Sequence, residues 1–159
     1  MYKVNDYVVY KRETCKINGI TTSKYSNEEV YVLAPISDNT LKIEVPTKSA
    51  NMRAVIDKDL LDSLISSIPS IDVIDLPDKQ LEGEYKRLMG TDDVEDLVRI
   101  IKTAYLNTKE RTDKKRRARD KDVIYFEKAE KCLYNEFSVV LNKSYDETKA
   151  YIMKKLESN

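Results

Sequence analysis

The sequence predicts an α+β protein, in which a small antiparallel β-barrel is followed by a compact α-helical domain. Two observations support this class. Residues 1 to about 50 contain short segments of β-branched and aromatic residues separated by turn signals, as in EEVYVLAPI, SDNT and LKIEVP. From Asp57 onward, the apolar residues recur at helical spacing instead. So short a β segment cannot build a sandwich, and a strongly bent barrel of the SH3 or Tudor type is the economical arrangement.

The segment LKIEVP gives the clearest strand signal in the first half. Its apolar side chains (Leu41, Ile43 and Val45) alternate with polar ones (Lys42 and Glu44). Successive side chains of a strand point to opposite faces, which predicts one buried face and one exposed face. Pro46 then stops the strand, and proline within sheets is confined mainly to edge strands. We therefore expect residues 41–46 to lie near an edge of the sheet.

The second half carries the signals of several helices. Asp57 is an N-cap candidate before one apolar stripe (Leu60, Leu61, Leu64, Ile65 and Ile68). Pro69 and Pro77 mark a connection, and a further helix is expected over LEGEYKRLM. Two longer stripes follow: Val94, Leu97, Val98, Ile101 and Tyr105, then Val123, Phe126, Leu133, Phe137 and Val140. Ser144 to Glu147 reads as a capping box before the last helix. The predicted organisation is a β domain at 1–56, a helix and connector at 57–77, and a helical domain at 78–159.

The composition argues against an enzyme and against a membrane protein. The 159 residues are 41% hydrophobic and 35% charged, with zero formal net charge and no histidine, so the commonest general base and metal ligand is missing. Cys15 and Cys132 have no paired spacing, which predicts two buried reduced thiols rather than a metal site or a disulfide framework. No apolar run approaches the roughly 18 residues of a membrane helix, and the start lacks the pattern of a secretion signal. We expect a cytoplasmic protein without a cofactor, metal, small-molecule substrate or membrane partner.

Positive charge is concentrated in KERTDKKRRARDK, residues 109–121, which hold eight Lys or Arg and three acids. One interpretation is a solvated linker between helices that end near Thr108 and begin near Asp120. The other is contact with nucleic-acid phosphates, because basic side chains that neutralise phosphates release counterions. The stretch has no aromatic residue for stacking on bases, so any such contact would follow the backbone without reading sequence.

Several segments, taken in order, resemble the CarD-like (CdnL) family of bacterial transcription regulators. They are YKVNDYVVY, the pair EEVYVLAPI and LKIEVP, the helix after Asp57, EYKRLM and EKAEKCLYNE. The similarity covers nearly the whole chain, and the order of the segments carries it rather than any single motif. It implies a Tudor-like N-terminal domain that binds the β subunit of bacterial RNA polymerase, and a helical domain that contacts promoter DNA. Such proteins catalyse no reaction and stabilise the melted promoter complex.

On the polymerase side, the resemblance makes LKIEVP the edge strand that adds to a strand of the partner. The residues it implies are Lys24, Lys42, Glu44, Val45 and Pro46. Lys42 and Glu44 would be the outward side chains, and Lys24 falls at a position that is commonly basic in the family. Glu44 departs from the family, which often has a basic residue there. The alternative is that these are ordinary exposed residues of a barrel.

On the DNA side, EYKRLM matches a helix where many family members carry a wedge tryptophan four residues before the tyrosine. That position is Leu81 here, and an apolar side chain can still wedge between base steps. Lys86 and Arg87 then become expected phosphate contacts. A basic loop on such a domain favours further phosphate contacts, which we assign to Lys114, Lys115, Arg116, Arg117 and Arg119.

Two alternatives stay open from the sequence. Leu81 can equally be a core residue, because it lies on a helix that must bury one face. The whole protein can equally be an adaptor whose barrel recruits a partner while the helical half is only structural, since the chain has no tryptophan and no net charge.

Overall fold

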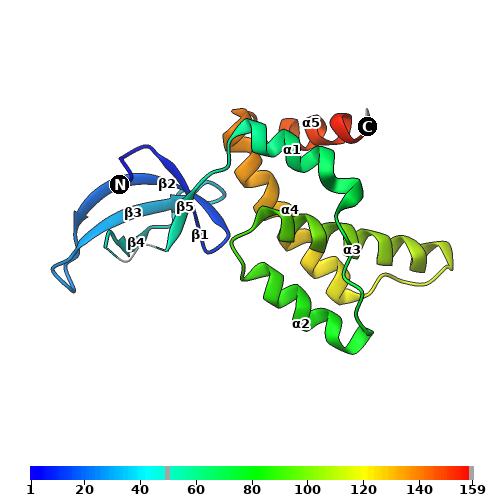
Figure 1. The fold of residues 1–159 in the computed structure, drawn as a ribbon. Coiled ribbons are helices and arrows are strands. Elements are labelled where there is room, and N and C mark those ends of the chain that lie inside the picture. The colour runs from blue at the N-terminus through cyan, green and yellow to red at the C-terminus, as the bar shows by residue number, and fades with distance from the viewer. Residues whose placement is uncertain (49–50, 158–159) are drawn as a thin grey trace.

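Figure 1 shows the computed structural model of the chain, which describes residues 1–48 and 51–157. Within these residues a five-stranded antiparallel sheet forms one half of the molecule, and five α-helices with one short 3-10 helix form the other. The α+β class predicted from the sequence is therefore confirmed. No helix in the described ranges is long and apolar enough to cross a membrane.

The sheet has the strand order β4-β3-β2-β1-β5, which places β4 and β5 at its two edges. The strands are β1 (Tyr7–Tyr10), β2 (Glu13–Thr22), β3 (Glu29–Pro35), β4 (Ile43–Pro46) and β5 (Met52–Ala54). Buried side chains from one face form a core of their own: Val8, Cys15, Ile17, Tyr31, Leu33 and Val45. The edge position expected for LKIEVP is confirmed.

The edge strand is shorter than the sequence predicts. It begins at Ile43 rather than Leu41, because a turn occupies the residues before it: the Leu41 amide donates to the Asp38 carbonyl at 3.2 Å. Thr40 also binds the Asp38 carboxylate through its amide and its hydroxyl. Leu41 is consequently exposed rather than buried.

The helices are α1 (Lys58–Ser67), η1 (Ile68–Ser70), α2 (Asp78–Met89), α3 (Val94–Asp113), α4 (Asp120–Leu141) and α5 (Tyr145–Glu157). Both predicted start signals are confirmed. The Asp57 carboxylate accepts a hydrogen bond from the Leu60 amide at 2.7 Å, which caps α1. Ser144 and Glu147 each bind the other's backbone amide at 3.1 Å, which is the reciprocal pattern of a capping box.

A second core lies between the helices, separate from that of the sheet. It includes Leu61, Leu64 and Ile65, so α1 is part of the helical half and only residues after it connect to α2. The predicted stripes are partly wrong: Leu60, Tyr105 and Val123 are exposed. Leu61, which the same stripe predicts, is buried, and Ala104 and Asp122 are buried in place of the residues that follow them.

Candidate functional site

The edge strand β4 leaves part of its backbone free for a partner. Within residues 1–48 and 51–157 it pairs only with β3, with Glu44 opposite Val32 and Val45 opposite Tyr31. The Thr47 amide continues this ladder by donating to the Glu29 carbonyl at 3.0 Å. Hydrogen-bonded and non-hydrogen-bonded pairs alternate in an antiparallel ladder, so the amide and carbonyl of Glu44 point away from β3. The Pro46 nitrogen, which has no hydrogen to donate, falls on the same outward side.

The predicted polymerase-facing residues divide into two groups. Glu44 and Lys42 are exposed, with Lys42 just before the strand, and Pro46 is half-buried at its end. Val45 requires a correction, because its side chain is only 4% exposed and belongs to the core of the sheet. The backbone of Val45 is not available either, because the same alternation directs its amide and carbonyl toward Tyr31 of β3.

Lys24 lies in the turn between β2 and β3, next to an exposed tyrosine that the sequence did not single out. Because Glu29 and Val30 begin β3 and face Thr47 and Pro46, this turn adjoins the Pro46 end of β4. Tyr25 in the same turn is 97% exposed. Exposed aromatic residues often anchor protein interfaces, so Tyr25 joins Lys24 as a candidate contact. Its signal in the sequence was a tyrosine inside the otherwise polar turn SKYSNEE.

Helix α2 overturns the expected DNA wedge. Leu81 is 3% exposed and packs in the helical core with Tyr85 and Leu88. These positions are spaced by four and three residues and therefore share the inward face of the helix. Tyr85 is held there by a hydrogen bond from its hydroxyl to Asp122 Oδ1 at 2.7 Å, inside the core. Leu81 is thus a core residue, and no side chain wedges outward from its position.

The outward face of α2 keeps two of the predicted phosphate contacts. Lys86 and Arg87 are both exposed near the end of the helix. Arg87 is paired with Glu84 one turn earlier, which reduces the net positive charge on that face. They lie about 12 Å along the helix from Asp78, because each residue advances the helix by about 1.5 Å.

The basic segment divides into a helical part and a loop. α3 extends to Asp113, five residues past the predicted end at Thr108, so the loop between α3 and α4 consists of residues 114–119. Four basic side chains of this loop are exposed: Lys114, Lys115, Arg116 and Arg117. Two have partners, since Lys114 pairs with Glu110 at 3.1 Å and Arg117 with Asp120 at 3.8 Å. Both pairs are solvent-exposed and therefore weak.

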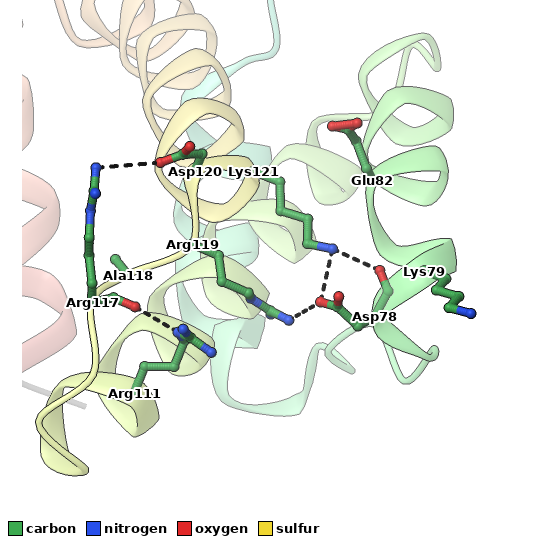
Figure 2. A pocket seen from close by; sticks show the side chains of 9 residues that line it. All are labelled: Asp78, Lys79, Glu82, Arg111, Arg117, Ala118, Arg119, Asp120 and Lys121. Atoms are coloured by element: carbon green, nitrogen blue, oxygen red, sulfur yellow. Dashed lines mark hydrogen bonds and ion pairs between the residues drawn. The ribbon is translucent and has the colours of Figure 1, made fainter.

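Arg119 differs from its neighbours and requires a correction. Figure 2 shows its guanidinium directed toward Asp78 at the start of α2, with which it forms an ion pair. Its Nε also donates to Asp122 Oδ2 at 2.9 Å. Lys121 Nζ approaches Asp78 Oδ1 at 2.8 Å, and this hydrogen bond keeps the pKa of Asp78 below its usual range. Arg119 therefore joins α4 to α2 and is not a free phosphate ligand.

These contacts line a shallow depression of about 550 Å³ beside the loop. Its lining holds five cations and three carboxylates, and Asp78 and Asp120 form ion pairs with three of these cations. Further exposed positive charge lies at the tip of the loop, outside the Asp78 network. We call the four exposed bases at 114–117 the basic tip.

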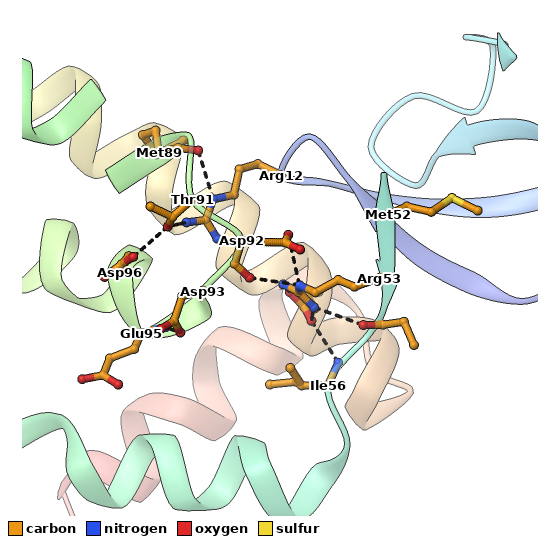
Figure 3. A network of polar contacts seen from close by, with 12 residues as sticks. Arg12, Met52, Arg53, Ile56, Met89, Thr91, Asp92, Asp93, Glu95 and Asp96 are labelled. Atoms are coloured by element: carbon orange, nitrogen blue, oxygen red, sulfur yellow. Dashed lines mark hydrogen bonds and ion pairs between the residues drawn. The ribbon is translucent and has the colours of Figure 1, made fainter. Parts of the chain in front are cut away.

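Two arginines of the sheet fix it against the helices, as Figure 3 shows. Arg12 donates from Nη2 to the Leu88 carbonyl at 2.8 Å and from Nε to the Met89 carbonyl at 3.1 Å. It thereby places positive charge at the C-terminal end of α2, where the helix dipole favours it. Arg53 makes a bidentate pair with Glu136 of α4, at 2.7 and 2.8 Å. These cross-contacts hold the two halves of the molecule together.

Both cysteines are free and neither is poised for chemistry. Burial raises the pKa of the thiols of Cys15 and Cys132 to about 11 each. Cys15 is buried as predicted, whereas Cys132 is half-buried. Nowhere in residues 1–48 and 51–157 do three or more acids or cysteines gather in a geometry that could hold a metal ion.

The candidate site therefore consists of two exposed surfaces, the edge of β4 and the basic tip. Figure 1 places them at opposite ends of the molecule, with the sheet at one end and the loop between α3 and α4 at the other. The chain matches no protein-family model, and no curated protein is significantly similar to it. Its function must be argued from these two surfaces.

Proposed function

We propose that this protein is a bacterial transcription regulator that joins RNA polymerase to promoter DNA. The sheet acts as a Tudor-like module, in which β4 adds to a strand of the polymerase β subunit. The helical half contacts the DNA backbone through the basic tip and through Lys86 and Arg87. The protein works by binding, in the cytoplasm, and catalyses no reaction.

The observation that carries the proposal is that the molecule has both an open strand edge and a distant cluster of exposed cations. An unpaired edge is a template for strand addition, and β4 presents the backbone of Glu44 for this purpose. The basic tip carries four exposed cations in a chain whose net charge is zero, so its field is local. A molecule with these features at opposite ends is suited to hold two partners at a fixed separation.

Holding melted DNA shifts an equilibrium rather than a chemical step. If the tip contacts the open promoter more strongly than the closed one, the open complex gains that difference in affinity. A difference of about 1.4 kcal/mol changes the ratio of open to closed complexes tenfold. Backbone contacts without base contacts make this effect independent of sequence at the contacted positions.

A test of the polymerase contact is Glu44→Pro, with Glu44→Ala as its matched control. Proline removes an amide that points away from β3, so the sheet keeps its own ladder and loses only a donor for the partner strand. We expect Glu44→Pro to abolish retention by the host RNA polymerase and the longer open-complex lifetime, and Glu44→Ala to keep both. Retention of Glu44→Pro at the wild-type level would remove β4 from the interface.

The DNA contact is tested separately by a double variant of the tip, Lys115→Gln with Arg116→Gln. Each phosphate contact contributes about 0.9 to the slope of log affinity against log salt, so losing two flattens it by roughly 2. The control is Lys58→Gln with Lys154→Gln, which removes two exposed cations from α1 and α5. An equal slope in both variants would exclude the tip from DNA binding.

The adaptor without DNA binding is the second candidate, and two observations favour it. Leu81 is buried, so the wedge that the family resemblance implied is missing. Arg119 is bound to Asp78 and Asp122, which removes one of the predicted phosphate contacts. Retention by polymerase together with no salt-dependent DNA affinity would establish the adaptor instead.

A further inference from the structure

An apolar cavity of about 630 Å³ lies within the helical half, between α1, α3, α4 and α5. Its inner wall consists of buried side chains, among them Val98, Leu133 and Phe137. Exposed apolar side chains, Tyr105 and Met153, line its mouth. Small-molecule sites in proteins typically measure about 300–1,000 Å³ and have mostly hydrophobic walls. Both the size and the lining of this cavity therefore fit a ligand-binding site.

Among the described residues, three charged groups face this cavity, and they are not equally available. Lys102 Nζ donates to the carbonyls of Ile68, Pro69 and Ile71 at 2.9, 3.2 and 2.7 Å, so its positive charge is already solvated by the protein. Glu130 is paired only loosely, with Lys149 Nζ 3.3 Å from its Oε1. Of these three groups, Glu130 is therefore a partly buried charge whose partner is easily replaced.

The two members of that pair differ in burial. The Glu130 side chain is 16% exposed, whereas that of Lys149 is 50% exposed. Lys149 can turn to water at little cost, because exposed ion pairs contribute about 1 kcal/mol or less. Glu130 cannot be left alone without a larger penalty, because a partly buried charge needs a partner. A ligand that replaces Lys149 must therefore bring a positive charge of its own.

The aromatic lining favours the same sign of charge. Tyr134 and Phe126 face the cavity together with Glu130, and ring faces attract cations. The negative charge of Glu130 already acts on Tyr134, whose pKa burial and this carboxylate together raise to about 12. An anionic ligand would have to take Lys149 from Glu130, and it would then lie beside an unpaired carboxylate that repels it.

We propose that this cavity binds an apolar organic ammonium, with its alkyl or aromatic body between the helices and its cationic nitrogen against Glu130. The proposal is independent of the transcriptional function above, since none of the residues used belongs to β4 or to the basic tip. It assigns a ligand site to the apolar stripes of α3 and α4, for which the sequence indicated only core packing.

The first experiment is calorimetric titration of the full chain with three probes of equal chain length: octylammonium, octanoate and 1-octanol. We expect octylammonium to bind about tenfold more tightly than octanol, which corresponds to about 1.4 kcal/mol for the added charge contact. Octanoate should bind more weakly than octanol. Equal binding of all three probes, a preference for octanoate, or no binding of any would overturn the proposal.

Charge variants identify the contact. Glu130→Gln should lower the affinity for octylammonium to that for octanol. Lys149→Gln should raise the affinity for octylammonium, because the competing cation is gone. At an anion site the same substitution would lower the affinity for the ligand. A weaker octylammonium affinity in Lys149→Gln would contradict the assignment even if the wild type binds this probe.

A steric pair locates the ligand. Ile101→Phe adds bulk to a half-buried position in the lining, and Ile124→Phe makes the same change at an exposed position outside it. Binding of octylammonium should be lost in the first variant and kept in the second, with both melting cooperatively. Binding that survives Ile101→Phe unchanged would place the ligand elsewhere and refute the site.

Discussion

At the scale of single residues, the most consequential side chains are carboxylates on a face that should be apolar. Asp122 and Glu136 both lie on the buried stripe of α4 and are fully or nearly fully inaccessible. Asp122 accepts hydrogen bonds from Tyr85 and Arg119, and Glu136 accepts them from Arg53 and from the Ile56 amide. A helical stripe predicted from apolar residues alone cannot include either position, and the predicted stripe contained the exposed Val123 instead.

Removing one partner of such a pair should cost more than removing a surface cation. Arg53→Ala leaves Glu136 buried without its bidentate donor, and we expect the free energy of unfolding to fall by about 3 kcal/mol. Arg87→Ala breaks an exposed ion pair with Glu84 and should change it by about 0.5 kcal/mol or less. Urea unfolding of the two variants measures the difference. Equal losses would mean that the Arg53 pair does not hold the halves together.

The buried thiols predict how stability depends on pH. Their pKa is about 11 in the folded protein against 9.0 for an unperturbed thiol, so the folded state holds its protons longer than the unfolded state. This contribution is present in full below about pH 9 and is lost as pH rises toward 11. We expect the unfolding free energy to fall between about pH 9 and 11, and to fall less in the double variant Cys15→Ala with Cys132→Ala. A drop of equal size in both proteins would assign the effect to other groups, such as Tyr134.

At the scale of elements, the sequence predicted the starts of two helices correctly but not the end of α3. Asp57 and Ser144 were found because capping side chains are local signals that act within a few residues. The end of α3 was missed because Lys, Glu and Arg are good helix formers, and no glycine or proline follows Thr108.

The turn between β1 and β2 was hidden for a related reason. Lys11 and Arg12 both have positive φ there, in positions where Asn and Gly are usual, and Arg12 is held by its contacts with α2.

The end of α3 provides a prediction at this scale. Lys115 has φ of 59°, and the Arg116 amide reaches back to the Arg111 carbonyl at 2.7 Å, which is a Schellman motif with lysine at the position that favours glycine. Lys115→Gly should therefore raise the free energy of unfolding by about 0.5–1 kcal/mol. Lys114→Gly removes the same charge at a φ of −91° and should lower it. Thermal melts of both variants test this. A loss of stability in Lys115→Gly would contradict the conclusion that the backbone of Lys115 is strained.

At the scale of the whole molecule, the sequence predicted two modules but not how they are joined. The join depends on contacts between residues about 80 positions apart, such as Arg12 with Leu88 and Arg53 with Glu136, for which one sequence contains no local signal. The same limit applied to α2: its existence was predicted, but only its packing showed that Leu81 faces the core. The join matters to the proposed function, because it fixes the distance and direction from β4 to the basic tip.

A rigid join should make the two contacts cooperate on one complex. In the proposed complex, polymerase would hold the sheet and thereby present the tip to the DNA at a high effective concentration, provided that the geometry is fixed. Arg12→Gln removes the bonds to the end of α2 while leaving β4 and the tip unchanged. We expect polymerase retention and the salt slope for DNA alone to stay at their wild-type values, and the open-complex lifetime to shorten. A lifetime equal to that of the wild type, in a variant that melts at a lower temperature, would show that the two halves act without a fixed orientation.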